Sequence, residues 1–135
     1  MDEPLPPANR PPEALTLMIV DDEEQKRLLL GRFLRRSFPQ VSLVECGNGA
    51  EAIAQLEKGA VDLVITDNRM EPVSGIELTR WIRARQPELP VLMVTGHPDL
   101  EKAAREAGAT RLIDFARYAE IGRIVAELLP GRPPS

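Results

Sequence analysis

The sequence contains one cysteine, one histidine and no long uncharged apolar run. With Cys46 alone, no intramolecular disulfide can form, and neither a C-x-x-C redox pair nor a zinc shell of Cys and His ligands is available. The lack of a long apolar run argues against a membrane-spanning helix, and the acidic, proline-rich first residues do not have the pattern of a secretory signal peptide. We therefore expect a cytoplasmic protein without a membrane partner.

An excess of positive charge is also missing. The 17 basic residues are fewer than the 21 acidic ones, the net charge is -4, and the two kinds are mixed along the chain. Proteins that bind nucleic acid directly usually carry a basic stripe, so we expect no direct contact with nucleic acid. No G-x-x-x-x-G-K-[ST] or G-x-G-x-x-G segment follows a strand-like run, so a nucleotide-binding site is not predicted either.

Proline divides the chain into three parts. Residues 1–14 contain five prolines and little apolar periodicity, which is typical of a disordered tail, and residues 130–135 have the same character. Residues 15–129 are enough for one domain with one core. We expect a single domain between two flexible tails.

Within that domain, short apolar runs alternate with stretches in which apolar residues recur at helical spacing. This alternation is typical of βαβ units, whose strands pair in parallel through right-handed crossovers. We expect an α/β fold, a doubly wound five-stranded parallel sheet flanked by helices. The expected strands are 15–20, 41–45, 62–66, 91–94 and 111–115; the expected helices are 23–36, 50–57, 76–85, one that begins near residue 98 and one that includes residues 121–129.

Acidic and hydroxyl side chains stand at the ends of these strands. Asp21 and Asp22 follow the first strand, Asp67 follows the third, and Thr95 follows the fourth. In a doubly wound sheet the carboxyl ends of the strands form the edge at which ligands bind. Like charges in a partly desolvated cleft call for a cation, and an all-oxygen set of ligands suits Mg²⁺ better than zinc. The sequence therefore predicts a magnesium site.

The carboxylate of Asp67 is placed to attack phosphorus, because a neighbouring cation offsets the charge of the incoming phosphoryl oxygens. The hydroxyl of Thr95 and the backbone N–H groups of residues 68–70 can donate hydrogen bonds to those oxygens. Helix capping explains Asp21 and Asp22 equally well when the pair is considered alone. The presence of Asp67 and Thr95 at matching strand ends favours a phosphoryl-transfer site.

Over about residues 15–129, the sequence resembles the receiver domain of bacterial two-component response regulators, a CheY-like, flavodoxin-like (βα)5 family. The resemblance lies in the acidic pair of MIVDDEE, in DLVITDNRM with Gly75 at family spacing, in the VTG of the fourth strand, and in Gly108 and Ala109. It implies a phosphoprotein of a phosphorelay that receives its phosphoryl group from a sensor histidine kinase or a phosphotransfer protein. It also implies a signalling module, not a turnover enzyme, that acts on a separate output protein or on an output domain outside this chain.

The resemblance assigns a role to each site residue by position. Asp67 matches the phosphoacceptor, Asp22 a direct Mg²⁺ ligand, and Asp21 an acidic partner that acts through water. The backbone carbonyl of Arg69 matches the position that completes the protein's share of the metal shell. Thr95 matches the switch hydroxyl.

Several positions depart from the family pattern. Phe115 stands where the family usually has a lysine that neutralises the phosphoryl charge, and Ala116 stands where a proline usually follows. Leu112 replaces a rotating Tyr or Phe, and Glu71 separates the preceding methionine from Pro72. The missing lysine is the departure that bears most directly on phosphoryl chemistry.

The missing lysine leaves other functions open. Arg111 and Arg117 lie near the gap in sequence, although neither has the register of the lysine. A pseudo-receiver, a protein-interaction module that keeps the acidic pocket without regulation by phosphorylation, is the main alternative. A phosphohydrolase with an aspartyl intermediate is less favoured, because such enzymes usually show a D-x-D pattern where this chain has DNR.

Overall fold

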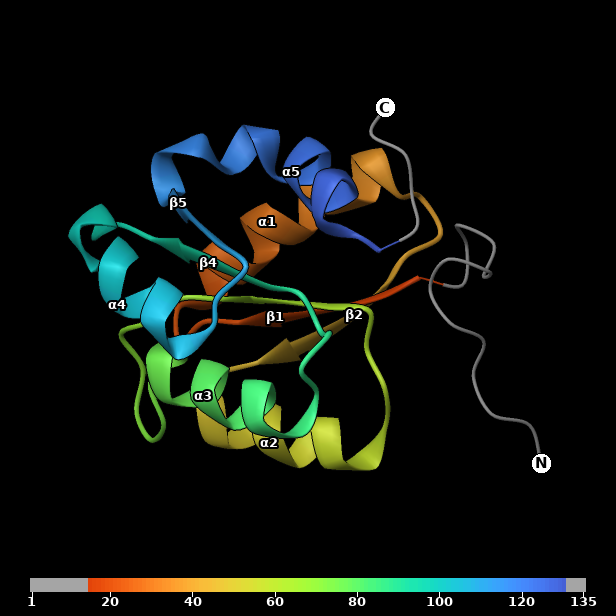
Figure 1. The fold of residues 1–135 in the computed structure, drawn as a ribbon. Coiled ribbons are helices and arrows are strands. Elements are labelled where there is room, and N and C mark those ends of the chain that lie inside the picture. The colour runs from red at the N-terminus through yellow and green to blue at the C-terminus, as the bar shows by residue number, and fades with distance from the viewer. Residues whose placement is uncertain (1–14, 131–135) are drawn as a thin grey trace.

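The computed structural model describes residues 15–130 and contains one five-stranded parallel sheet with the strand order β2-β1-β3-β4-β5 (Figure 1). The expected doubly wound fold is confirmed. The expected tails, residues 1–14 and all but the first residue of 130–135, lie outside the described residues. The strands are β1 (Thr16–Val20), β2 (Ser42–Cys46), β3 (Leu63–Thr66), β4 (Val91–Thr95) and β5 (Arg111–Asp114); the helices are α1 (Glu24–Ser37), α2 (Gly49–Lys58), α3 (Gly75–Arg85), α4 (Glu101–Ala107) and α5 (Ile121–Leu128), with 3₁₀ turns η3 (Pro98–Leu100) and η4 (Phe115–Glu120).

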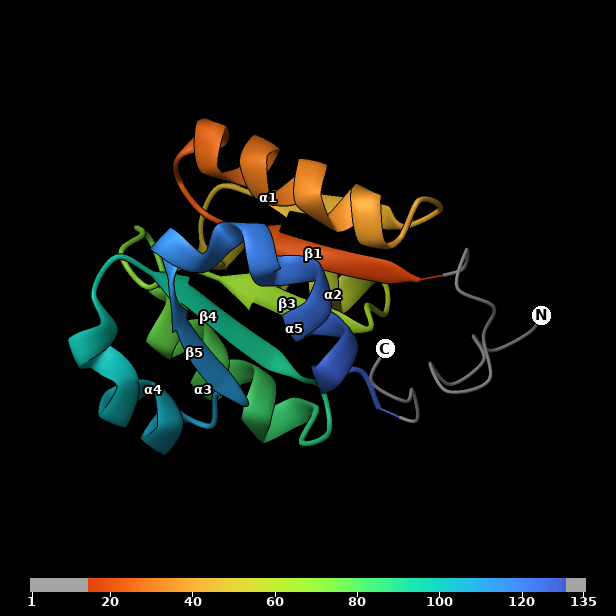
Figure 2. The same ribbon diagram turned by 90° about the horizontal axis from the view of Figure 1, so that it is seen from above.

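Helices cover both faces of the sheet. Helices α1 and α5 lie side by side on one face, and α2, α3 and α4 lie on the other (Figures 1 and 2). The chain moves from β1 outward to β2 and then returns across β1 to β3, so the direction of winding reverses between β1 and β3. In open α/β sheets this reversal opens a crevice at the carboxyl ends of the strands, which is where ligands bind.

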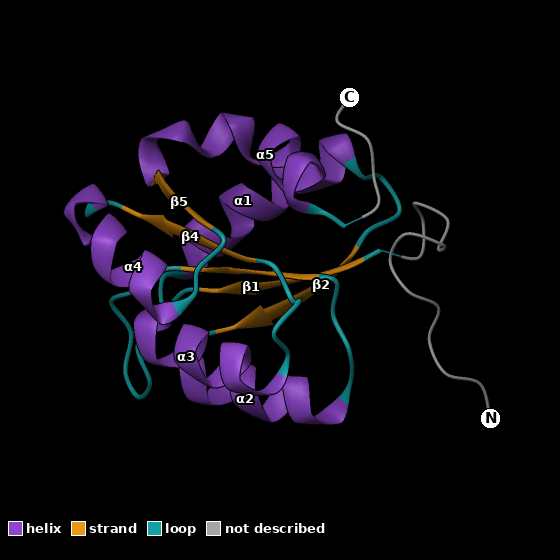
Figure 3. Ribbon diagram, in the orientation of Figure 1, coloured by secondary structure: helices purple, strands orange, loops and turns teal. Residues whose placement is uncertain are grey.

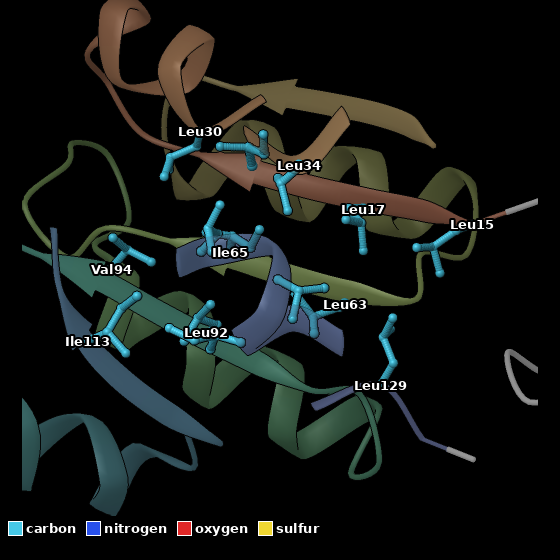
Figure 4. Close-up of a cluster of buried hydrophobic side chains, with 14 residues drawn as sticks. Leu15, Leu17, Leu30, Leu34, Leu63, Ile65, Leu92, Val94, Ile113 and Leu129 are labelled. Atoms are coloured by element: carbon cyan, nitrogen blue, oxygen red, sulfur yellow. The ribbon is translucent and has the colours of Figure 1, made fainter. Parts of the chain in front are cut away.

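The alternation of side chains along the strands divides the core into two layers. In β1, Leu17 and Ile19 belong to the cluster beneath α1 and α5, whereas Met18 and Val20 belong to the cluster beneath α2 and α3. Figure 4 shows the first cluster, which also contains Leu34 of α1. A strand that is covered on both faces has a continuous run of apolar residues in its sequence. The segment LTLMIV is such a run, and it therefore identifies β1 clearly.

Several element boundaries differ from the expected ones by one residue, and the difference that bears on the site is at the end of β5. The fifth strand was expected to include Phe115, but β5 ends at Asp114 and Phe115 begins η4. The side chain of Asp114 accepts a hydrogen bond from the backbone N–H of Ala116 at 2.9 Å, and this cap turns the chain out of the sheet. The connecting loops that position the site appear in teal in Figure 3. Within residues 15–130, no helix combines the length and apolar character needed to cross a membrane.

Candidate functional site

Three carboxylates meet at the carboxyl edge of β1 and β3. These strands pair in parallel with Val20 opposite Thr66, so the residues that follow them, Asp21 and Asp67, emerge beside each other. One carboxylate oxygen from each of Asp21, Asp22 and Asp67 lies within 4.8 Å of the others. The structure therefore brings together the three acidic residues predicted from the sequence.

The backbone holds two of these carboxylates in fixed positions. Asp67 is 7% exposed, and its Oδ1 accepts a hydrogen bond from the N–H of Asn68 at 2.7 Å. Asp21 is 4% exposed, and its Oδ1 accepts a hydrogen bond from the N–H of Glu23 at 2.9 Å. Asp22, in contrast, is exposed at the rim of the cluster. One side of the cluster is therefore shielded from water and the other is open.

Burial and crowding change the acidity of Asp21. Desolvation raises the pKa of Asp21 to about 6, and the negative charges of Asp67 and Asp22 act in the same direction. The Glu23 N–H and the ammonium group of Lys26 oppose this rise. At neutral pH the cluster therefore carries negative charge at a cost that a bound cation would relieve.

Removal of the Asp21 charge is expected to stabilise the protein when divalent ions are absent. The folded-state pKa lies above the unfolded value, so between pH 4 and 6 the native state binds more protons and stability falls as pH rises. We expect Asp21→Asn to raise the free energy of unfolding by about 1–2 kcal/mol at pH 7.5 in EDTA, with the gain vanishing near pH 4. Asparagine retains the oxygen that accepts from Glu23.

Urea unfolding at several pH values measures this effect, with Asp22→Asn as the matched control. Because Asp22 is exposed, its replacement is expected to change stability by less. A gain for Asp21→Asn that stayed constant from pH 4 to 8 would contradict an origin in the Asp21 charge.

The oxygen donors fit a magnesium ion. Mg²⁺ prefers one or two carboxylates, a carbonyl and several waters, and the cluster opens into a surface hollow through which water can reach it. Arg69, whose backbone carbonyl the resemblance assigns to the metal shell, is exposed and lines this hollow together with Asp22. The hollow is lined by Asp22, Asn68, Arg69, Met70, Glu71 and Ser74.

Thr95 lies at the end of β4, the next strand along the sheet from β3. It is fully buried, and its hydroxyl oxygen accepts a hydrogen bond from the N–H of His97 at 3.1 Å. Accepting this bond leaves the hydroxyl hydrogen available for donation. The structure therefore places the predicted hydroxyl on the same edge of the sheet as Asp67.

The loop between β3 and α3 is held against Asp67 by Gly75. The N–H of Gly75 donates to the carbonyl of Asn68 at 3.0 Å, and the N–H of Ile76 donates to the Asn68 side chain at 2.9 Å. A Cβ atom on Gly75 would lie 2.0 Å from the carbonyl oxygen of Asp67. The glycine noted in the sequence is therefore needed for close backbone approach.

Phe115 follows Asp114, which pairs with Thr95 across β4 and β5, and it contacts a residue that the sequence analysis missed. Lys26 of α1 places its ammonium nitrogen 4.9 Å from the centre of the Phe115 ring. Partial burial lowers the pKa of Lys26, but its bond to Glu23 and the charges of Asp21 and Asp67 outweigh this and raise it. The available signal was helical spacing, since Lys26 lies only one turn after the acidic pair.

The two arginines near the missing lysine are engaged elsewhere. Arg111 pairs with Glu127 of α5 at 3.0 Å, and Arg117 pairs with Glu120 at 3.0 Å. These contacts direct both guanidinium groups toward the acidic residues of η4 and α5. Neither arginine takes the position of the missing lysine.

Comparison with known sequences identifies relatives of this site. A model of the response regulator receiver domain matches residues 17–115. The chain is 37% identical over 102 residues to the transcriptional activator protein ExaE of Pseudomonas putida, and 36% identical over 110 residues to the response regulator protein PilR of Pseudomonas aeruginosa. The matches cover 74% and 77% of this chain but 48% and 24% of those proteins, so the chain spans less than half of either.

Solved structures agree with the sequence comparisons. The response regulator protein TrrA from Thermotoga maritima, determined in complex with Mg²⁺ and BeF, superposes with a TM-score of 0.77 at 26% identity and covers 85% of this chain and 99% of its own. The receiver domain of NtrX from Brucella abortus gives a TM-score of 0.73 at 27% identity, with 82% of this chain and 94% of its own covered.

Proposed function

The chain belongs to the response regulator receiver family, and we propose that it accepts a phosphoryl group on Asp67 beside a Mg²⁺ ion. The observation that carries this proposal is the meeting of Asp21, Asp22 and Asp67 within 4.8 Å at the switch point of the sheet. A buried carboxylate in such a cluster is an oxygen nucleophile at a site suited to a cation.

The transfer uses the geometry of Asp67. An Asp67 carboxylate oxygen forms a bond to phosphorus while the bond from phosphorus to the donor's histidine nitrogen breaks, and the released imidazole takes up a proton. The N–H of Asn68 orients the nucleophile through its 2.7 Å bond to Oδ1. Fixed orientation of this kind lowers the entropic part of the barrier.

Asp22, Asp67 and the backbone carbonyl of Arg69 would hold the metal directly, and Asp21 would hold it through water. A bound Mg²⁺ supplies charge compensation for the phosphoryl oxygens and the attacking carboxylate. The raised pKa of Asp21 supports this assignment, because a buried carboxylate that is costly to ionise gains most from a cation nearby.

Thr95 would form a hydrogen bond with the phosphoryl group on Asp67. Its hydroxyl hydrogen can donate to a phosphoryl oxygen while its oxygen still accepts from His97. We infer that this bond favours one of two arrangements of the β4–η3 loop and thereby alters the surface seen by partners.

The partners follow from the same proposal. The phosphoryl donor would be a sensor histidine kinase or a phosphotransfer protein, and the receiver would act as a signalling module on an output domain or a separate output protein. The relatives ExaE and PilR are more than twice as long as the matched segment, which is consistent with an output region attached to this type of domain. The single cysteine suits a reducing compartment, and we place the exchange in the cytoplasm.

The pseudo-receiver alternative is not favoured. It depended on Phe115 in place of the family lysine, but relatives found by sequence are response regulators, and the acidic cluster is intact. Burial and, to a smaller extent, the neighbouring carboxylates raise the pKa of Asp21, and a bound cation would offset this cost.

Incubation with acetyl phosphate and Mg²⁺, followed by intact-protein mass spectrometry, tests the proposal. We expect one labile phosphoryl adduct that is absent in EDTA and disappears on treatment with hydroxylamine, which cleaves acyl phosphates. Absence of any adduct under conditions that label an ordinary receiver domain would reject phosphorylation and restore the pseudo-receiver alternative.

A further inference from the structure

We propose that Lys26 of α1 supplies the positive charge that a phosphoryl group on Asp67 requires, and that Phe115 positions the Lys26 ammonium group for this task. The inference rests on the proposed phosphorylation of Asp67. In this proposal a lysine of α1 takes the role that the family usually gives to a lysine after the fifth strand, where this chain has Phe115.

The need for a cation follows from charge. Phosphorylation adds roughly one further negative charge to a site that already contains the carboxylates of Asp21 and Asp22. A divalent ion compensates only part of the total. A side-chain ammonium that bonds a phosphoryl oxygen would supply a charge-assisted contact, which is about twice as strong as a neutral hydrogen bond.

The position of Lys26 meets this need. Its charge acts on both Asp21 and Asp67, and these interactions raise its pKa despite partial burial. The reverse interaction, from Lys26 to Asp21, lowers the pKa of Asp21. Its side chain is only 27% exposed and comes from the first turn of α1, which begins two residues after Asp22. A protonated amine therefore already lies within electrostatic reach of Asp21 and Asp67.

Two contacts fix the position of the ammonium group. It lies 4.9 Å from the centre of the Phe115 ring, and it forms an ion pair with Glu23 at 3.2 Å. Phe115 is itself packed against Tyr118, with ring centres 5.7 Å apart. An aromatic face attracts a cation without neutralising it, so Phe115 restricts Lys26 while the ammonium group keeps N–H donors beyond the one that Glu23 engages.

Other basic side chains near this edge are committed to different partners. Arg27 donates to Glu45 and to the backbone carbonyl of Asp21, while Arg111 and Arg117 pair with acidic residues of η4 and α5. The charge of Lys26, in contrast, acts on both Asp21 and Asp67. Lys26 is itself paired with the exposed Glu23, so what distinguishes it is its contact with Phe115 together with its interaction with Asp21 and Asp67.

The experiment compares four variants with the wild-type chain: Lys26→Met, Lys26→Arg, the double variant Lys26→Met/Phe115→Lys, and Lys102→Met. Lys102 is an exposed lysine on α4 and serves as the control. Calorimetry measures binding of beryllium fluoride in the presence of Mg²⁺, and a separate titration measures binding of Mg²⁺ alone. Intact-protein mass follows loss of the phosphoryl adduct formed with acetyl phosphate.

We expect Lys26→Met to weaken beryllium fluoride binding and shorten the lifetime of the adduct about tenfold, the effect of losing one charge-assisted hydrogen bond. The same variant should bind Mg²⁺ alone at least as tightly as the wild type, because a repelling cation has been removed. Lys26→Arg should retain most of the binding. The double variant should recover it, because a lysine at position 115 returns an ammonium group to the same place.

The pattern separates a charge from a packing effect. Structural damage would weaken the binding of Mg²⁺ and of beryllium fluoride together, and a lysine at position 115 would not repair it; that result overturns the inference. If the wild type is labelled and Lys26→Met is indistinguishable from it, the inference fails while the proposed function stands. If the wild type neither forms an adduct nor binds beryllium fluoride, both fail.

Discussion

Replacement of Asp67 by asparagine is expected to abolish the phosphoryl adduct. The amide is nearly the same shape as the carboxylate and keeps an oxygen that can accept from the N–H of Asn68, now at 2.7 Å from Oδ1. It lacks the anionic oxygen that attacks phosphorus, and it removes one charge from the three-carboxylate cluster. We expect no adduct on Asp67→Asn after incubation with acetyl phosphate and Mg²⁺, measured by intact-protein mass.

The matched control is Asp99→Asn, which changes an exposed carboxylate on η3 of the same edge of the domain. Its labelling should equal that of the wild type. An adduct of undiminished yield on Asp67→Asn would show that another side chain accepts the phosphoryl group. Loss of labelling in both variants would indicate damage to the fold, which circular dichroism would reveal.

Most of the fold was predictable because its signals are local. Buried parallel strands carry unbroken apolar runs, and LVIT of β3 and VLMVT of β4 are fully buried as such runs require. Turns and caps also have local signatures, as in the Ser74 and Glu77 capping box that begins α3. The end of β5 was misplaced because an apolar Phe115 continues the strand pattern, whereas the cap from Asp114 decides the conformation.

The site was predictable to the extent that it depends on strand ends. Asp21 and Asp67 occupy positions that any parallel β1–β3 pair brings together, so their convergence follows from topology. The contact between Lys26 and Phe115 joins α1 to η4, two segments far apart in the chain, and it depends on how α1 packs over the sheet. A contact of this kind leaves no local sequence pattern. The sequence therefore showed that the family lysine is replaced by Phe115, but it did not show that Lys26 lies against Phe115.

Gly75→Ala is expected to be the most destabilising single change at this edge of the domain. Alanine is the better helix former, and at an unconstrained helical position the change would be favourable. Here the added Cβ would lie 2.0 Å from the Asp67 carbonyl oxygen and 2.9 Å from the Asn68 Cα, both backbone atoms that cannot rotate away. Separating α3 from the β3 loop also lengthens the bond from the Gly75 N–H to Asn68, now 3.0 Å.

We expect Gly75→Ala to lower the free energy of unfolding by about 3 kcal/mol, as measured by urea denaturation. The same shift moves the Asp67 backbone, so binding of Mg²⁺ should weaken together with stability. Gly59→Ala is the matched control, because a Cβ there meets nothing within 4 Å and the backbone is extended. If the two variants unfold alike, close approach of α3 to Asp67 does not explain the glycine; if Gly75→Ala alone loses stability and metal binding, the glycine positions the aspartate.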